Sequence, residues 1–438
     1  MRILLVDPPF NAFMHYDRWY FPSSLAQLAA VAHKNGHETF IYDADRYFYK
    51  DVRTKNRNIL IGNQSFYFDN VDNFDHYIWK HYLKTLEDFR PDIVGCTIYT
   101  CKLKSCLNLL KLTKIFNPKI KTCVGGAHAT ALPETLITKE YIDNVFIGHS
   151  EMTFPLWIDD GMTYEGIIHG DPQKIDFENL PYVRRQSLLF IEKYTKRDLS
   201  LMITSRGCIG KCRFCSNPFM WKGKPLFRKS ESVRNELIEL VEKWKIKELL
   251  LSDPSMSCIH KESKRIAEII KEFNIPWSAN VRWATLKPEL IEHFMNCGCK
   301  TVKVGLESGS DKMLRYTKKG CTKDLIIEKA KIINSFKIPW HLFSIVGFPN
   351  ETKEDMIETM ELAMEISPTS ISLNSFSPLP GTYFYNMLND ITPEFASSVN
   401  QLNPTYSFSE QIDDKSFIDI FIKIINAFHQ YNLSQRNP

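Results

Sequence analysis

Short apolar runs alternate with longer segments of helical periodicity between residues 199 and 390, and this alternation constrains the fold more than any other feature. The apolar runs predict strands at 199–204, 248–252, 277–281, 301–305, 340–346 and 370–374. The segments between them predict helices at 230–244, 261–273, 288–297, 322–336 and 354–366. Strands that alternate with helices build a parallel sheet. The number of repeats is too small for a closed eight-stranded barrel and predicts an open, partial (β/α)6 barrel over 199–390.

The first 165 residues carry a second alternation of strands and helices. Strands are predicted at 2–6, 37–42, 91–97, 120–124 and 144–148, and helices at 23–33, 75–89 and 103–116. Ser23 is expected to cap the first helix, and Asn35-Gly36 to end it. The pattern predicts an α/β fold for residues 1–165, with a parallel, doubly wound, Rossmann-like sheet that binds ligands at the carboxyl ends of its strands.

Three stretches depart from the alternation. Residues 46–90, rich in Tyr, Phe and Asn, are an insertion, interpreted either as a lid or oligomer contact or as aromatic residues that fill the core. Residues 166–198 are predicted as a linker, to which Arg184-Arg185 adds exposed polar character. Residues 391–438 are predicted as a helical C-terminal segment. Its amphipathic helix at 416–431 either covers the open barrel and shapes a substrate cavity or serves plain structural packing.

A loop with three cysteines follows the first strand of the barrel. Cys208, Cys212 and Cys215 have C-x3-C-x2-C spacing, and cysteine thiolates are the ligands of iron–sulfur clusters. A cubane with only three protein ligands leaves one iron free to bind a small molecule. The alternatives are a structural zinc knuckle or unrelated core thiols, but no fourth Cys or His follows at a usual zinc spacing. The four other cysteines of the barrel are interpreted as core thiols, namely Cys258, Cys297, Cys299 and Cys321.

Polar residues and glycines follow the predicted strands at their carboxyl ends. In the first domain these are Pro9, Thr97, Tyr99, Thr100, Gly125, Gly126, His128, Gly148 and Glu151. In the barrel they include Asp253, Arg282, Glu307, Ser308 and Gly347. Because the carboxyl ends of parallel strands meet at one edge of the sheet, each set is expected to form one site.

The cysteine loop, with Arg206-Gly207 before it and Phe214 beside the last cysteine, resembles the radical S-adenosylmethionine (SAM) superfamily. The resemblance implies that Cys208, Cys212 and Cys215 ligate a [4Fe–4S] cluster whose free iron is chelated by the amino and carboxylate groups of SAM. It also implies reductive cleavage of SAM to methionine and a 5′-deoxyadenosyl radical that abstracts hydrogen.

The resemblance further implies SAM contacts along the edge of the barrel. Glu307 and Ser308 match the segment that contacts the ribose and methionyl part, and Arg282 is expected to pair with the SAM carboxylate. The stretch through Ile345 to Gly347 matches the one that backs the adenine. The other candidate SAM-binding residues are Phe214, Ser216 and Asp253.

The strand ends of residues 1–165 together resemble the cobalamin-binding domain of class B radical SAM enzymes, which implies that the nine residues named there bind cobalamin. One departure is Gly148-His149-Ser150-Glu151, where the family commonly has Gly-Glu-Gly-Glu. The chain also lacks the Asp-x-His-x-x-Gly signature of a lower axial histidine, so the corrin is expected base-off, with its lower face empty, hydrated or blocked by a side chain. A degenerate domain that binds nothing, or another flat ligand, is the alternative.

Composition bears on partners and cellular location. A net charge of only +4 does not indicate the positively charged surface that binds nucleic acid. No apolar run approaches the ~20 residues that a membrane-spanning helix needs. No signal-peptide pattern is visible at the amino terminus. With eleven cysteines and no such signal, the expected setting is a reducing cytoplasm.

The resemblance implies a C-methyltransferase that works through a 5′-deoxyadenosyl radical and methylcobalamin, with methionine, 5′-deoxyadenosine and S-adenosylhomocysteine as co-products. It also implies an external electron donor such as flavodoxin or ferredoxin. A cobalamin-dependent cyclase or rearrangement enzyme without methyl transfer is the alternative in the same fold. A non-catalytic iron–sulfur or corrin-binding protein is the alternative of another class. The sequence identifies neither the substrate, a small molecule or a peptide, nor a catalytic side chain.

Overall fold

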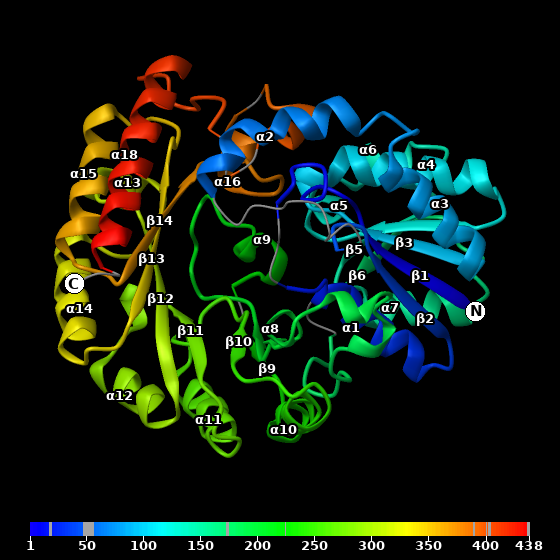
Figure 1. Cartoon of the computed structure of the whole chain (residues 1–438), viewed down its shortest axis with the longest axis horizontal. Helices are drawn as coiled ribbons and strands as arrows, with labels where there is room; N and C mark the ends of the chain where they lie inside the picture. Colours follow the sequence, from blue (N-terminus) through cyan, green and yellow to red (C-terminus); the bar gives the residue numbers. More distant parts are fainter. Residues whose placement is uncertain are drawn as a thin grey trace. The chain divides into compact units, whose positions relative to one another are not determined.

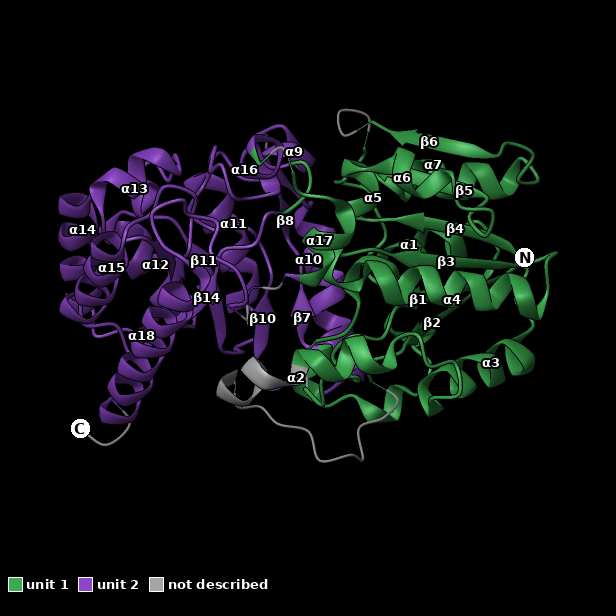
Figure 2. Ribbon diagram, turned by 90° about the horizontal axis from the view of Figure 1, so that it is seen from above, with its two compact units in different colours: residues 1–199, 379–381, 388–398 green, residues 200–378, 382–387, 399–438 purple. Residues whose placement is uncertain are grey.

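The computed structural model describes residues 1–16, 20–46, 57–171, 175–223, 225–388, 390–399, 401 and 404–435, with the backbone alone for 57–63. The chain divides into two compact units (Figure 2). Unit 1 comprises residues 1–199, 379–381 and 388–398, and unit 2 comprises 200–378, 382–387 and 399–438. Within the described ranges, no helix is both long enough and apolar enough to cross a membrane.

Unit 1 is built on a six-stranded parallel sheet with strand order β2-β1-β3-β4-β5-β6 (Figure 1). The strands are β1 (Arg2–Asp7), β2 (Glu38–Asp43), β3 (Ile93–Thr97), β4 (Lys121–Gly125), β5 (Asn144–Gly148) and β6 (Gly166–Gly170). The predicted doubly wound sheet is confirmed. β6 was not predicted: the five residues of this short strand, which begins and ends in glycine, stand where the sequence predicted the start of the linker.

Helices cover both faces of this sheet. The pair α1 (Ser23–Lys34) and α7 (Ser150–Asp159) pack together, as do α3 (Tyr77–Phe89) and α4 (Leu103–Phe116). The shorter helices are α5 (Ala127–Ala131), α6 (Pro133–Ile137), α8 (Lys196–Leu199) and α17 (Pro393–Ser398). The predicted cap of α1 is wrong, because Ser23 is already helical and the preceding Pro22 has no side chain able to cap. The predicted end is confirmed, with Asn35 as C-cap and Gly36 at φ +84°.

The insertion at 46–90 fills the core in its described part. It contains α2 (Arg57–Asn70) and α3. Tyr67 of α2 is buried, and its ring centroid lies 4.9 Å from Phe10 and 5.8 Å from Phe13. Trp79 and Tyr82 of α3 are also buried. These contacts favour the core-filling interpretation of the insertion, and residues 47–56 lie outside the described part of the chain.

The predicted linker packs closely on unit 1. Arg185, predicted to be exposed, is fully buried: its Nε donates to Leu199 O (2.9 Å), and its guanidinium lies 5.0 Å from the Phe21 ring centroid. The Leu189 amide donates to Ile41 O of β2. An aromatic ring and a backbone carbonyl thus offset the cost of burying the Arg185 charge, which the local sequence did not reveal.

Unit 2 contains a second six-stranded parallel sheet, with order β14-β13-β12-β11-β10-β7, which confirms the open barrel (Figure 1). The strands are β7 (Leu201–Met202), β10 (Leu249–Leu251), β11 (Trp277–Val281), β12 (Cys299–Glu307), β13 (Trp340–Val346) and β14 (Ser370–Ser375). The helices between them are α10 (Ser230–Ile238), which continues as the π-helix η4 (Glu239–Lys243), α11 (His260–Lys271), α12 (Pro288–Asn296), α13 (Asp311–Tyr316), α14 (Lys323–Ser335) and α15 (Lys353–Glu365). Along β13 Trp340 and Leu342 are buried, whereas His341, Phe343 and Ile345 are half-buried.

The C-terminal helix α18 (Asp414–Ser434) packs against α15 and β14. Its Asn432 side chain pairs with both the amide and the carbonyl of Ile371 in β14. Phe417, fully buried at its start, lies against Gly347, where an added Cβ would stand 2.7 Å from the phenyl ring. These contacts are those of structural packing, the plainer of the two interpretations of this helix.

Candidate functional site

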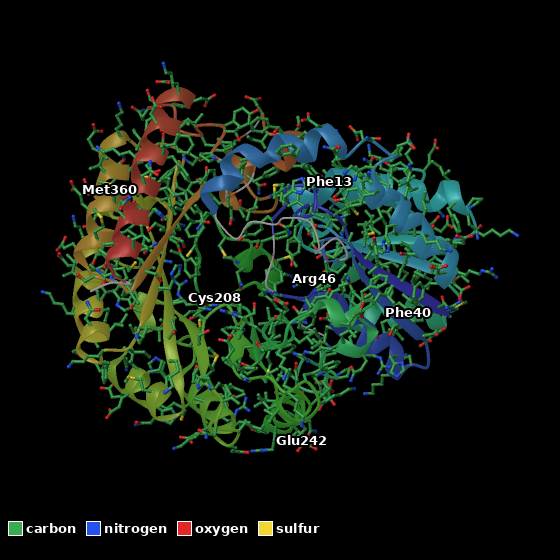
Figure 3. All side chains as sticks on the ribbon, viewed as in Figure 1. Phe13, Phe40, Arg46, Cys208, Glu242 and Met360 are labelled. Carbon is green, nitrogen blue, oxygen red and sulfur yellow. The ribbon has the colours of Figure 1, made fainter. Side chains whose placement is uncertain are left out.

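The three cysteines lie on a loop between β8 (Ser205–Arg206), which pairs with β9 (Leu226–Phe227), and α9 (Asn217–Trp221). Cys208 and Cys212 are buried and Cys215 is half-buried. The loop's own amides point at sulfur: the Gly210 amide donates to Cys208 Sγ and the Asn217 amide to Cys215 Sγ, each at 3.4 Å. Amide donors stabilise thiolates, the form in which cysteine binds metal. Cys208 is labelled in Figure 3.

Arg282, which follows β11, lies beside two of these sulfurs. Its Nη1 is 3.6 Å from Cys208 Sγ and 3.9 Å from Cys212 Sγ, and its Nη2 donates to Lys319 O at 3.1 Å. Gly210 leaves room for it, since an added Cβ there would stand 2.3 Å from Arg282 Nη1. The predicted partner of the SAM carboxylate is therefore held next to the cysteine loop.

The loop cysteines differ in acidity. A hydrogen bond from the Cys258 thiol, whose Sγ lies 3.9 Å from Cys208 Sγ, lowers the pKa of Cys208 to about 5, with help from the Gly210 amide and Arg282 against the effect of burial. Burial raises the pKa of Cys215 to about 11. Cys258 had been interpreted as a core thiol, and only the fold, which brings two positions 50 residues apart together, reveals the contact.

Asp253 anchors the start of the loop. Its Oδ1 accepts hydrogen bonds from the Thr204 amide (2.9 Å) and hydroxyl (3.0 Å) and from the Ser205 hydroxyl (2.6 Å) and amide. Its Oδ2 is buried and has no partner among the residues that the structure describes. Burial raises the pKa of Asp253 to about 6. Asp253 Oδ1 thus fixes the start of the cysteine loop, and Oδ2 can accept a hydrogen bond from a ligand.

Glu307 ends β12 with φ +65°, a backbone conformation that is uncommon outside glycine. Its Oε1 accepts a 2.7 Å hydrogen bond from Lys319 Nζ, and both side chains are nearly buried. Lys319 was missed in the sequence, where its only signal is a Lys-Lys-Gly turn at 318–320. The structure therefore gives the predicted ribose contact a cationic neighbour beside the cysteine loop.

The other predicted SAM residues are distributed unevenly. Ser308 is fully buried, with its hydroxyl 3.2 Å from Thr359 Oγ1 of α15, so it faces the helix layer and is not brought to the others. Phe214 packs on Phe348, with ring centroids 5.6 Å apart. The remaining three lie at the ends or on the half-buried face of their elements, namely Ser216 before α9, Ile345 in β13 and Gly347 after β13.

Glu351 organises the turn after β13. Its Oε2 accepts from the amides of Gly347 and Phe348. Its Oε1 is buried without a partner in the described part of the chain, and burial raises the pKa of this carboxyl to about 8. No role was predicted for Glu351, which lies four residues beyond Gly347, the last residue of the stretch matched to the adenine contact.

In unit 1, the ends of β3 and β4 are joined by hydrogen bonds. The Ile98 amide donates to Gly125 O (2.8 Å), the His128 amide donates to Ile98 O (3.2 Å), and His128 Nδ1 lies 3.1 Å from Thr100 Oγ1. Gly126 has φ +99°, and an added Cβ would stand 2.9 Å from Thr97 Oγ1. Gly126 is thus required by its backbone conformation and by its close packing against Thr97 and Ile98.

The remaining candidate cobalamin residues lie at the same carboxyl edge. Tyr99 is 54% exposed, whereas Pro9 and Glu151 are buried. The Gly148 amide donates to the Thr130 hydroxyl at 3.0 Å. His128 is buried, and burial lowers its pKa to about 4.

A buried ionic group fixes the loop after β1. Lys102 Nζ donates to Asp7 (2.6 Å) and to Asp45 (2.9 Å), and all three side chains are almost fully buried. Asp45 also accepts from the amides of Phe10 (2.7 Å) and Ala12 (2.9 Å). This group was missed in the sequence, because its members lie as much as 95 positions apart.

The residues present fit the cofactors that the sequence suggested. On or after the strands of unit 2, several buried polar atoms lack a partner within the described ranges: Asp253 Oδ2, Arg282 Nε, Ser344 Oγ, Glu351 Oε1 and Ser377 Oγ. Buried polar atoms are normally satisfied, so unpaired atoms at strand ends are available to a polar ligand. The edge of unit 1, with glycine backbone and the exposed Tyr99, suits a flat, bulky ligand.

The two units match two family models. A model of the radical SAM superfamily matches residues 202–363, and a model of the B12 binding domain matches residues 19–157. Three relatives are informative: an uncharacterised methyltransferase of Pyrococcus horikoshii (30% identity over 68% of this chain and 70% of the relative), the cytidylyl-2-hydroxyethylphosphonate methyltransferase of Streptomyces wedmorensis (24%, 87% and 80%), and the anaerobic magnesium-protoporphyrin IX monomethyl ester cyclase of Rubrivivax gelatinosus (25%, 69% and 59%).

Solved structures share the fold. The radical SAM methyltransferase TsrM from Kitasatospora setae, with tryptophan and a SAM analogue bound, superposes with a TM-score of 0.67 at 16% identity, covering 87% of this chain and 74% of TsrM. The cobalamin-dependent SAM radical enzyme OxsB, with aqua-cobalamin and SAM bound, gives a TM-score of 0.61 at 16% identity, covering 93% of this chain and 58% of OxsB. At these identities the likeness concerns the fold.

Proposed function

We propose that the chain, which belongs to the cobalamin-dependent (class B) radical SAM enzymes, methylates an unactivated carbon of its substrate. The chain is 30% identical to the Pyrococcus relative and matches both family models, so the cofactors of the family are its cofactors: a [4Fe–4S] cluster, SAM and cobalamin. The observation that carries the proposal is the three-thiolate loop, open at a fourth position, in a chain with two methyltransferase relatives.

In this proposal Cys208, Cys212 and Cys215 hold the cluster, and the amides of Gly210 and Asn217 keep sulfur in the thiolate form. A cluster held by these three thiolates would supply one iron without a protein ligand, at which SAM would be chelated. The guanidinium of Arg282 is the cation available to that carboxylate, since it lies within 3.9 Å of two cluster sulfurs.

Glu307 accepts from the SAM ribose or ammonium group, and Lys319 holds its carboxylate in place. Asp253 Oδ2 accepts a further hydrogen bond, while the stretch from Ser344 to Gly347 backs the adenine and Glu351 holds the amide of Gly347. The rest of the SAM site is formed by Phe214, Ser216 and Ile345, whereas Ser308 turns its hydroxyl to Thr359 and takes no part in it.

The cobalamin site uses backbone more than charge. Gly125 and Gly126 let the corrin approach the β4 edge, and Tyr99 offers an exposed ring. Buried hydroxyls and the imidazole next to them support this edge, and the full set is Pro9, Thr97, Tyr99, Thr100, Gly125, Gly126, His128, Gly148 and Glu151.

The overall reaction consumes two SAM molecules and two electrons from an external one-electron donor such as flavodoxin or ferredoxin. One SAM gives its methyl group and leaves as S-adenosylhomocysteine. The other is reduced and leaves as methionine and 5′-deoxyadenosine, which carries the hydrogen taken from the substrate carbon. When bound, cobalamin supplies the relay of the methyl group, and the chain's own residues position the reactants and exclude water. The substrate class is a small molecule or a peptide.

The test uses holoenzyme reconstituted anaerobically and SAM labelled in its methyl group, incubated with candidate substrates and a low-potential reductant. The proposal expects the label in a carbon-bound methyl group and one S-adenosylhomocysteine and one 5′-deoxyadenosine per product. A cyclase or rearrangement enzyme would give 5′-deoxyadenosine and an unlabelled product instead. The Rubrivivax relative is named as a cyclase. A chain that bound cluster and corrin yet cleaved no SAM would point to the non-catalytic alternative.

A further inference from the structure

Cys258 is a thiol that approaches the cysteine loop from elsewhere in unit 2. It lies between β10 and α11, 50 residues beyond Cys208, and its Sγ is 3.9 Å from Cys208 Sγ. In this contact the Cys258 thiol is the donor and the Cys208 sulfur the acceptor.

The three cysteines are unequal in the donors that they receive. Cys208 faces the Gly210 amide at 3.4 Å, Arg282 Nη1 at 3.6 Å and the Cys258 thiol. Cys215 faces the Asn217 amide at 3.4 Å. Hydrogen bonds to the sulfurs of an iron–sulfur cluster raise its reduction potential, because reduction adds negative charge that the donors stabilise.

We propose that Cys258 is a positioning residue of the cluster: its thiol donates a hydrogen bond to the Cys208 sulfur and so raises the reduction potential of the cluster. The proposal rests on the assignment of Cys208 as a ligand, and it assigns Cys258 itself no iron. The consequence is that an external one-electron donor reduces this cluster more readily than the three-cysteine loop alone would allow.

The experiment compares full-length Cys258→Ala and Cys258→Ser with the wild-type protein and with Cys299→Ala, all reconstituted anaerobically without SAM. Cys299 is the matched control, a buried thiol at the amino end of β12 whose own hydrogen bond goes to Thr301 O. Iron and sulfide content are measured first. The midpoint potential of the cluster then comes from a redox titration followed by electron paramagnetic resonance.

The expected result is wild-type iron content in all three variants, with a midpoint potential shifted to more negative values in Cys258→Ala. Cys258→Ser, whose hydroxyl still donates, is expected to lie between Cys258→Ala and wild type, and Cys299→Ala to match wild type. The Ser rescue separates hydrogen-bond donation from a loss of packing, which both substitutions share.

Three outcomes would overturn the proposal. If the midpoint potential of the cluster is unchanged in Cys258→Ala, the hydrogen bond from Cys258 does not affect reduction of the cluster. Loss of iron in both Cys258 variants makes the residue a ligand or a structural part of the loop. An equal shift in Cys299→Ala makes the effect nonspecific. Because the potential is measured without substrate, failure of the methylation assay would leave this result standing, and the two proposals fail separately.

Discussion

Both sheets carry buried charged residues at the carboxyl ends of their strands, but the two units differ in how completely these charges are paired. In unit 1 the charges at the carboxyl ends are paired: Lys102 is shared between Asp7 and Asp45 within 2.9 Å. In unit 2 the carboxyls of Asp253 and Glu351 are buried. In each of them one oxygen accepts hydrogen bonds from the protein, and the other has no partner among the described residues. The carboxyls named in both units are buried, so the two groups differ in whether each carboxylate oxygen has a partner.

This difference separates two ways of building a ligand site. A satisfied network such as that of Lys102 fixes a loop and leaves ligand recognition to the backbone beside it, here the Gly125-Gly126 edge. An unsatisfied set costs stability until a ligand supplies the missing partners. Unit 1 is therefore expected to hold its shape without a cofactor, whereas unit 2 is expected to gain more from ligand binding.

The largest effect is expected from Cys212→Ala, which removes one of three cluster ligands. We expect complete loss of SAM cleavage and loss of most bound iron, because two thiolates cannot hold the cluster that three ligate. Iron analysis and the 5′-deoxyadenosine yield measure this. Cobalamin binding, read from the corrin absorbance, should persist because it belongs to unit 1. The matched control is Cys101→Ala, a half-buried thiol of unit 1, which should retain its iron.

The next largest effect is expected from Lys102→Met, which removes the cation that pairs with Asp7 and Asp45 in unit 1. Removing the cation leaves Asp7 and Asp45 buried together, and breaking a buried ion pair costs about 3–5 kcal/mol of unfolding free energy. Urea unfolding of the cofactor-free protein measures it. The control is Lys104→Met, whose partner Asp72 is exposed, and surface pairs contribute no more than about 1 kcal/mol. Equal losses in the two variants would mean that the network does not hold unit 1 together.

Gly126→Val tests the backbone approach at the edge of unit 1. The new Cβ would stand 2.9 Å from Thr97 Oγ1, at a φ of +99° that a β-branched residue avoids. We expect cobalamin to bind about 100-fold more weakly, about 2.7 kcal/mol, with the iron content unchanged. Gly36→Val is the control, because Gly36 also has positive φ but no atom stands within 4 Å of an added Cβ. Comparable cobalamin affinity in both variants would remove Gly126 from the site.

Much of this comparison was visible in the sequence, and the reason is local. The cysteine spacing lies within eight residues, and the strand ends are marked by glycine, proline or a charged residue after an apolar run. These signals survive without knowledge of packing. They predicted both sheets and the edge of each that bears the polar residues.

What the sequence could not supply are pairings set by packing between distant positions. Cys258 meets Cys208 across 50 residues, and Lys102 meets Asp7 across 95. Arg185 is buried because its guanidinium lies over the Phe21 ring and donates to the Leu199 carbonyl. The residues next to Arg185 in the sequence do not indicate these contacts. Ser308 stands beside Glu307 in the chain, yet its hydroxyl contacts α15, since neighbouring side chains at a strand end face opposite sides.

The smallest effect, a difference in slope, is expected from Glu351→Gln at the unsatisfied edge of unit 2. Burial raises the pKa of Glu351 to about 8 in the folded protein, above its ordinary 4.5, so the folded state binds the proton more tightly than the unfolded state does. The stability gained from this proton is present in full below pH 4.5 and is lost as the pH rises through about 8. Between pH 5 and 7 the wild-type unfolding free energy should therefore fall, by at most about 1.4 kcal/mol per pH unit for one proton.

Glutamine cannot ionise, so the Glu351→Gln protein should show a flatter dependence over the same range. Urea unfolding at several pH values, followed by circular dichroism, measures the two slopes. Glu354→Gln removes an exposed carboxylate from the same helical region and should keep the wild-type slope. Equal slopes in wild type and Glu351→Gln would mean that Glu351 is ionised in the folded protein with a partner for its second oxygen. In that case the carboxyl of Glu351 would be paired as those of Asp7 and Asp45 are, and the contrast between the two units would disappear.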